Sequence, residues 1–173
     1  MSYKDLVILN NEKVFEKNGN FYCDNLDLKV LPEGLNEHHK VTYLVRKSKK
    51  EKLQKINIKN IKRGSNIFKF IYLVIKTFKI EKCDYLIVCI TPYTFLAYLF
   101  LRLFKKKVFV YLFSSGHEEY KHILGNWSVW IYDLMYKTLT SKSEVIVCHE
   151  RLHPKEKSHL VYISRLDDEW LSN

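Results

Sequence analysis

The chain alternates short apolar runs of strand length with longer segments of helical periodicity, and this alternation limits its possible folds more than any other feature. Seven runs are predicted to be strands, at residues 6–9, 41–45, 56–61, 85–90, 108–113, 145–148 and 160–163. Helices are predicted at residues 24–35, 66–80, 91–104 and 126–142. Strands that alternate with helices form right-handed βαβ units around a parallel sheet. The sequence therefore predicts an α/β fold, a doubly wound parallel sheet with helices on both faces.

The segments between these elements are predicted to be loops. Residues 10–25 are mostly polar and contain the turn signal Asn18-Gly19-Asn20. Residues 114–119 form the loop after the strand at 108–113. The helix at 126–142 is expected to turn an apolar stripe towards the core, because four large residues share one face: Trp127, Trp130, Ile131 and Leu134.

Size and composition predict one cytoplasmic domain that covers residues 1–173. Hydrophobic residues make up 47% of the chain, enough for a core, and 28% charged residues with 14% aromatic residues exclude a disordered chain. The first 13 residues leave no room for the apolar stretch of a signal peptide, because four of them are charged: Lys4, Asp5, Glu12 and Lys13. The four cysteines show no CxxC spacing and are expected to be free thiols.

Residues 85–101 are uncharged and almost long enough to cross a membrane. Thr91 and Pro92 interrupt this stretch, and threonine followed by proline is a typical start of a helix. A buried strand followed by a core helix is therefore predicted, with no membrane span.

The net charge of +10 is concentrated in one part of the chain. Residues 40–82 contain 14 Lys and Arg against Glu51 and Glu81, a net charge of +12, and the remaining residues sum to −2. Three interpretations remain open for this stretch. It could contact an anionic membrane surface, it could bind nucleic acid, or its lysines could be a solvated rim around a core helix. No base-reading motif supports nucleic acid. A membrane contact would involve a stripe of three lysines on the predicted helix at 66–80: Lys69, Lys76 and Lys79.

The order of the elements resembles the N-terminal, acceptor-side half of the GT-B glycosyltransferases. Four segments carry the likeness: LVILN with a later glycine, LNEHHKVTYLV at 35–45, KVFVYLFSSGHEEY at 107–120, and SEVIVCHERL followed by LVYISRLDDEWL. The resemblance implies a Rossmann-like domain that holds the acceptor. The C-terminal domain, which binds the donor in that family, is expected to be absent from residues 1–173. A lone Gly19 stands where the family has a glycine-rich turn.

Ligands of open parallel sheets bind at the carboxyl ends of the strands. Six residues at these ends are predicted to contact the acceptor: Gly19, Asn20, Thr91, Tyr93, Ser115 and Gly116. His117 is the first candidate for a catalytic residue, because imidazole can accept a hydroxyl proton and Gly116 lets backbone approach a ligand. Glu118 and Glu119 are candidates for binding acceptor hydroxyls or for the base. A solvent-exposed histidine without a function is the alternative for His117.

Other kinds of site are not favoured by the sequence. Cys148, His149 and His153 are close in the chain, but Pro154 and the preceding strand prevent a helix from aligning them on a metal. Ser114 and Ser115 lack the GxSxG pattern of a nucleophile elbow. No metal and no cofactor are expected.

The predicted function is transfer of a sugar from a nucleotide donor to a membrane-associated glycan or glycolipid acceptor, in the synthesis of a cell-surface polysaccharide. The resemblance implies that the domain needs a donor-binding half or a partner subunit to be active. The alternative is a non-catalytic subunit of a split glycosyltransferase that anchors its partner at the membrane surface.

Overall fold

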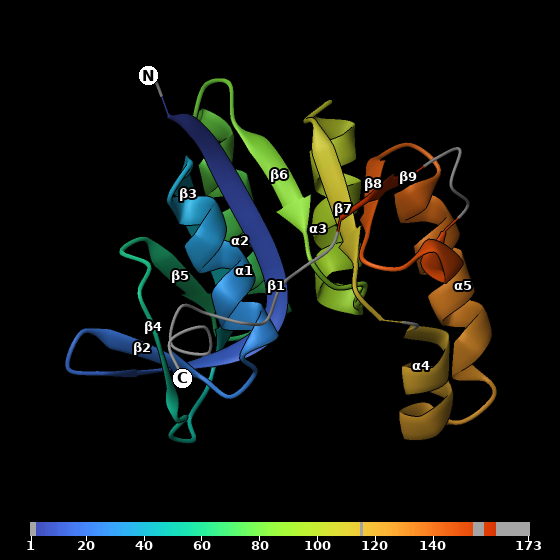
Figure 1. Ribbon diagram of the computed structural model, residues 1–173, viewed down its shortest axis with the longest axis horizontal. Helices are drawn as coiled ribbons and strands as arrows, with labels where there is room; N and C mark the ends of the chain where they lie inside the picture. The colour runs from blue at the N-terminus through green and yellow to red at the C-terminus, as the bar shows by residue number, and fades with distance from the viewer. Residues whose placement is uncertain (1–2, 115, 154–157, 162–173) are drawn as a thin grey trace, which may run out of the picture.

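The computed structural model describes residues 3–114, 116–153 and 158–161, which form one mostly parallel sheet with helices against it (Figure 1). The strands are β1 (Lys4–Lys17), β2 (Asn20–Cys23), β3 (His39–Lys47), β4 (Gln54–Ile56), β5 (Ile61–Gly64), β6 (Asp84–Ile87), β7 (Val108–Leu112), β8 (Glu144–Val147) and β9 (Ser158–Leu160). The helices are α1 (Asp27–Asn36), α2 (Ile67–Lys76), α3 (Pro92–Leu103), α4 (Gly116–Leu124) and α5 (Ser128–Thr140). Two short 3-10 turns, η1 (Thr77–Lys79) and η2 (Glu150–Leu152), complete the set. The predicted α/β class is confirmed.

The parallel strands lie in the order β5, β3, β1, β6, β7, β8 and β9. The chain builds outwards from β1 to β3 and β5, and then returns to place β6 on the other side of β1. The direction of the strand order therefore changes between β1 and β6. Ligands of such sheets bind beside this change, at the carboxyl ends of the strands.

Each central strand is buried on both faces, which explains why its sequence is a continuous apolar run. Val7 and Leu9 join the core under α2, α3 and α5, whereas Leu6 and Ile8 join the core on the other face, where Leu31 and Leu35 of α1 pack. Residues 85–101 form β6 and most of α3, as predicted, and no helix among the described residues is long and apolar enough to cross a membrane.

The prediction of a loop at residues 10–25 is wrong. Strand β1 continues to Lys17 and forms an antiparallel hairpin with β2, in which Lys17 faces Asn20. The turn residues Asn18 and Gly19 both have positive φ, 52° and 76°, which is the conformation that a two-residue hairpin of Asn-Gly adopts. The turn signal was therefore correct, but it marks a hairpin. The prediction of one strand at 56–61 is also wrong, because β4 ends at Ile56, β5 begins at Ile61, and residues 57–60 connect them.

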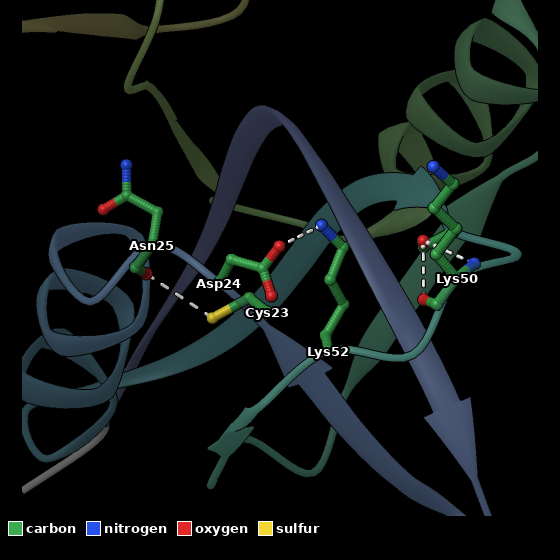
Figure 2. A network of polar contacts seen from close by, with 6 residues as sticks. Cys23, Asp24, Asn25, Lys50 and Lys52 are labelled. Carbon is green, nitrogen blue, oxygen red and sulfur yellow. Dashed lines mark hydrogen bonds and ion pairs between the residues drawn. The ribbon is translucent and has the colours of Figure 1, made fainter.

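The base of this hairpin is connected to the segment before β4 by an ion pair (Figure 2). Lys52 forms an ion pair with Asp24, and the thiol of Cys23 donates to the carbonyl oxygen of Asn25 at 3.5 Å. Burial raises the pKa of the Cys23 thiol to about 11, so this side chain stays neutral at physiological pH. The ion pair joins the end of β2 to the segment before β4, with which β2 pairs.

The predicted apolar face of the helix at 126–142 is also wrong. The residues of α5 that are buried against the sheet are Tyr132, Met135 and Leu139. Trp127 and Trp130 are 61% and 63% exposed, Leu134 is exposed, and Ile131 is half-buried. Apolar residues occur on both sides of this helix, so periodicity alone could not identify the side that faces the core.

Candidate functional site

A small pocket lies at the carboxyl ends of β6 and β7, next to the position where the strand order changes direction. Its volume is about 70 Å³. The apolar part of its wall consists of Val88, Ile90, Tyr111, Leu112, Phe113 and Tyr132, and the remaining lining residues are Cys89, Thr91, Ser114, Gly116, Glu119 and Tyr120. An apolar wall with a few convergent polar groups is typical of ligand sites, but the volume of this pocket is well below the roughly 300–1,000 Å³ of such sites and admits only a small group of a larger ligand.

Thr91 is held in the wall of this pocket by the start of α3. It caps the helix, because its Oγ1 accepts from the amide of Thr94 at 3.4 Å, and the hydroxyl of Thr94 bonds back to the amide of Thr91 at 3.0 Å. Thr94 also donates to the carbonyl oxygen of Cys89 at 2.6 Å. The predicted start of the helix is therefore confirmed, and the same bonds order the chain between β6 and α3.

Gly116 lets α4 lie directly on α5. A Cβ atom built at this position would overlap the ring of Tyr132. The prediction of a loop at 114–119 is thus wrong from Gly116 onwards, where α4 begins. The close contact between Gly116 and Tyr132 determines which side of α4 faces the pocket.

Glu119 is the one carboxylate among the described residues that line the pocket. The hydroxyl of Ser114 donates to its Oε1 at 2.7 Å, which orients the carboxylate beside the end of β7. Burial raises the pKa of the Tyr120 phenol and of the Cys89 thiol, each to about 12. These two groups therefore stay neutral at physiological pH, and Glu119 remains as the group that can accept a proton from a bound hydroxyl.

His117 lies in the first turn of α4 but does not line the pocket. Its Nε2 is 2.5 Å from Oδ1 of Asp133 on α5, and its ring contacts the rings of Tyr132 and Tyr136. Asp133 therefore holds the imidazole against α5. Glu118 and Glu119 are both exposed, but only Glu119 is among the lining residues.

The six predicted acceptor residues are not all brought together. Thr91 and Gly116 line the pocket, and Tyr93 follows Thr91 on the first turn of α3. Gly19 and Asn20 lie at the tip of the β1–β2 hairpin, on the opposite side of the molecule from α4 in Figure 1. The loop with Gly19 that was expected next to the site is thus part of a different surface. Ser115 lies outside the described residues.

Sequence reasoning missed a second set of polar residues at this edge of the sheet, next to the pocket. Nη1 of Arg46 donates to Oδ1 of Asn11 at 3.2 Å, and its guanidinium carbon lies 4.4 Å from the centre of the Tyr93 ring. The amide of Asn11 donates to Sγ of Cys89 at 3.2 Å. The position of Arg46, directly after the apolar run at 41–45, was the signal that could have identified it, because that position is a strand end.

The three lysines of the predicted stripe are exposed. The ammonium groups of Lys69 and Lys76 lie 4.9 Å and 4.7 Å from the centre of the Tyr72 ring. Lys79 belongs to the short turn that follows α2. No group of three metal-ligating side chains is arranged around a common point among the described residues.

Comparisons with known proteins identify no relative. The chain matches no protein-family model, and no curated protein or solved structure is detectably similar to it.

Proposed function

We propose that this protein is the acceptor-binding, Rossmann-like half of a GT-B-type glycosyltransferase, with a doubly wound sheet. It would transfer a sugar from a nucleotide donor to a hydroxyl of a membrane-associated glycan or glycolipid. The observation that carries the proposal is a pocket at the carboxyl edge, beside the change in strand order, that contains one oriented carboxylate. The fold by itself does not determine the activity, so the argument depends on this site.

Glu119 is the group we assign to the proton transfer. An acceptor hydroxyl in the pocket would lie beside its carboxylate, and Glu119 would accept the proton as the hydroxyl oxygen attacks the anomeric carbon of the donor. The nucleotide leaves with the electrons of the bond that breaks. Thr91 supplies a further hydroxyl in the wall, and Ser114 keeps the carboxylate in place.

His117 is assigned a positioning role. Its bond to Asp133 joins the first turn of α4 to α5, and Glu119 lies two residues further along the same helix. The donor is expected to be held by a second domain or by a partner subunit, which would close over this edge of the sheet.

The direct test is a transfer assay with the protein isolated from its source cells together with whatever remains bound to it. The assay supplies radiolabelled UDP-, GDP- and CMP-sugars and a lipid extract of the same membranes. Labelled lipid or glycan is expected with one of the donors. No labelled product with any donor, from an intact preparation, contradicts the proposal.

A second function, attachment to a membrane surface, is favoured by the outer faces of the helices. Helices α2, α3 and α5 pack side by side on one face of the sheet. Their exposed apolar side chains are Phe68, Tyr72 and Ile75 on α2, Leu96, Leu99 and Leu103 on α3, and Trp130 and Leu134 on α5. Phe68 is 82% exposed and Leu103 is 73% exposed. Exposed apolar side chains that gather on adjoining helices are typical of a surface that contacts a partner or a membrane.

Basic residues border this apolar surface. Lys69, Lys76 and Lys79 lie along α2 and the turn after it, and Arg102 lies at the end of α3. Aromatic and aliphatic side chains mixed with lysines are typical of a helix that lies in the interface of an anionic membrane. We assign an anionic membrane surface as the binding partner of this face. The basic side chains match the negative charge of the lipid headgroups, and the apolar side chains match the lipid interior.

Replacing Lys69, Lys76 and Lys79 together by glutamine is expected to weaken binding to vesicles of anionic and neutral phospholipid at least tenfold. Each lysine near such a surface contributes about 1 kcal/mol, and part of this contribution is screened by salt. Vesicle sedimentation measures the effect. The matched control replaces three exposed lysines outside the helix layer: Lys40, Lys55 and Lys59. Equal losses in both variants, or binding that does not depend on anionic lipid, would contradict the assigned surface.

A further inference from the structure

We propose that Arg46, together with Asn11 and Tyr93, binds the acidic group of the acceptor, a phosphate or a carboxylate, next to the pocket that contains Glu119. The anion site is argued from the geometry of these residues alone. Its assignment to the acceptor rests on the proposed function.

The guanidinium of Arg46 is held in place from two directions. The Tyr93 ring lies under it, at 4.4 Å from the ring centre, and the side-chain oxygen of Asn11 accepts one of its N–H groups at 3.2 Å. When a guanidinium stacks on an aromatic face, its N–H groups remain free to donate hydrogen bonds in the plane of the guanidinium. A fixed fork of this kind matches the paired oxygens of a phosphate or a carboxylate.

Arg46 lacks a carboxylate partner among the described residues, none of which places an Asp or Glu oxygen within 4.0 Å of its side-chain nitrogens. Several other cations of the sheet are paired, as Arg63 is with Glu16, Lys4 with Asp84 and Lys107 with Glu144. Arg46 is half-buried, so its charge is only partly solvated by water. A half-buried cation of this kind is stabilised by an anion that arrives from outside.

A bulge in β1 brings Asn11 to Arg46. The pairing of β1 with β3 shifts between Leu9 and Lys13, and Lys13 then faces Arg46. Bulges of this kind redirect side chains and are frequent beside active sites. As a result, Asn11 bonds Arg46 through its side chain and Cys89 through its amide.

Asn10 fixes the bulge from inside the protein. It is almost completely buried, its Nδ2 donates to the Tyr43 hydroxyl at 2.8 Å, and its Oδ1 accepts from the amide of Glu12 at 3.0 Å. The thiol of Cys89 donates to the same Oδ1 at 3.4 Å. Because Cys89 also lines the pocket, these bonds connect the position of Arg46 to the position of the pocket wall.

The arrangement specifies the class of acceptor. The hydroxyl that receives the sugar would lie at Glu119, and an acidic group of the same molecule would reach Arg46 across the ends of β6 and β1. Two sources supply such a group: the phosphate of a lipid-linked glycan and the carboxylate of an acidic sugar. Both present paired oxygens to the guanidinium.

The test titrates ¹⁵N-labelled protein with inorganic pyrophosphate and, separately, with glucuronate, at constant ionic strength. Binding is followed by NMR at the amides of Asn11 and Cys89 and at the Arg46 side chain. At least tenfold weaker binding is expected for R46Q, and a smaller loss is expected for R46K, which keeps the charge and loses the fork. The control is K55Q, a loss of one positive charge at an exposed position of β4, which should bind like the wild-type protein. Spectra of the variants verify that each one is folded.

Tighter binding of pyrophosphate points to a lipid-linked phosphate, and tighter binding of glucuronate points to an acidic sugar. Binding of neither anion, or binding that R46Q leaves unchanged, overturns the proposal. Shifts confined to the lysines at the other edge of the sheet, Lys4, Lys82, Lys105, Lys106 and Lys107, overturn it as well. The titration involves no sugar transfer, so the two tests are independent. A negative transfer assay does not contradict the anion site, and a negative titration does not contradict a positive transfer assay.

Discussion

Replacing Gly116 by alanine is expected to lower the free energy of unfolding by about 3 kcal/mol, the upper part of the range for overpacked cores. The added Cβ would overlap the ring of Tyr132, a residue of α5 that is buried in the core. The Tyr132 ring cannot move away easily, because it also contacts the rings of Tyr120, Tyr136 and His117. Urea unfolding followed by tryptophan fluorescence measures the change.

The control for this prediction is Gly34→Ala in α1, because an alanine there meets no atom within 4 Å. Alanine favours a helix over glycine, so this variant should be more stable by about 0.5–1 kcal/mol. Equal stability of the Gly116→Ala variant and the wild-type protein would show that α4 does not lie on Tyr132. In that case the orientation of Glu119 towards the pocket would be wrong too.

If Glu119 is the base of the proposed sugar transfer, replacing it by glutamine is expected to lower the turnover at least 100-fold. Removal of a positioned general base costs roughly 10²- to 10⁴-fold in rate. Glutamine has almost the same shape and keeps an oxygen that can accept from the Ser114 hydroxyl, so the pocket should retain its form. The loss is therefore expected in kcat, with little change in the KM of the acceptor.

Glu81→Gln, which removes an exposed carboxylate in the turn before β6, is the control for this loss and should leave turnover unchanged. His117→Asn provides a second comparison. It is expected to have a smaller effect, because His117 acts on α4 through Asp133. If His117→Asn abolishes transfer and Glu119→Gln does not, the base is the histidine and the assignment to Glu119 is wrong.

The fold class followed from the sequence because the central strands are buried on both faces. A run such as the one at residues 85–90 is apolar throughout, and the Thr91-Pro92 pair marks the helix that follows it. The second half of β1 could not be recognised in this way. It lies in a hairpin with mostly polar residues, and Val14 is the one buried side chain between Asn11 and Lys17.

The site was predictable in its location and less so in its residues. The carboxyl ends of the strands were expected to form it, and Thr91, Gly116 and Glu119 do lie together there. Which side of residues 116–124 faces the pocket depends on the contact between Gly116 and Tyr132, which are 16 positions apart. The role of Arg46 depends on a bulge in a different strand, and no local pattern reports that bulge.

The central claim is that the pocket at the carboxyl edge binds the acceptor. Hydrogen–deuterium exchange of the protein, with and without the acceptor that the transfer assay labels, tests this claim most directly. Slower exchange is expected at residues 88–91 and at Gly116, Glu119 and Tyr120, which line the pocket, and no change is expected at the hairpin of Lys17 and Asn20. Protection confined to the hairpin or to the amino ends of the strands would contradict the account.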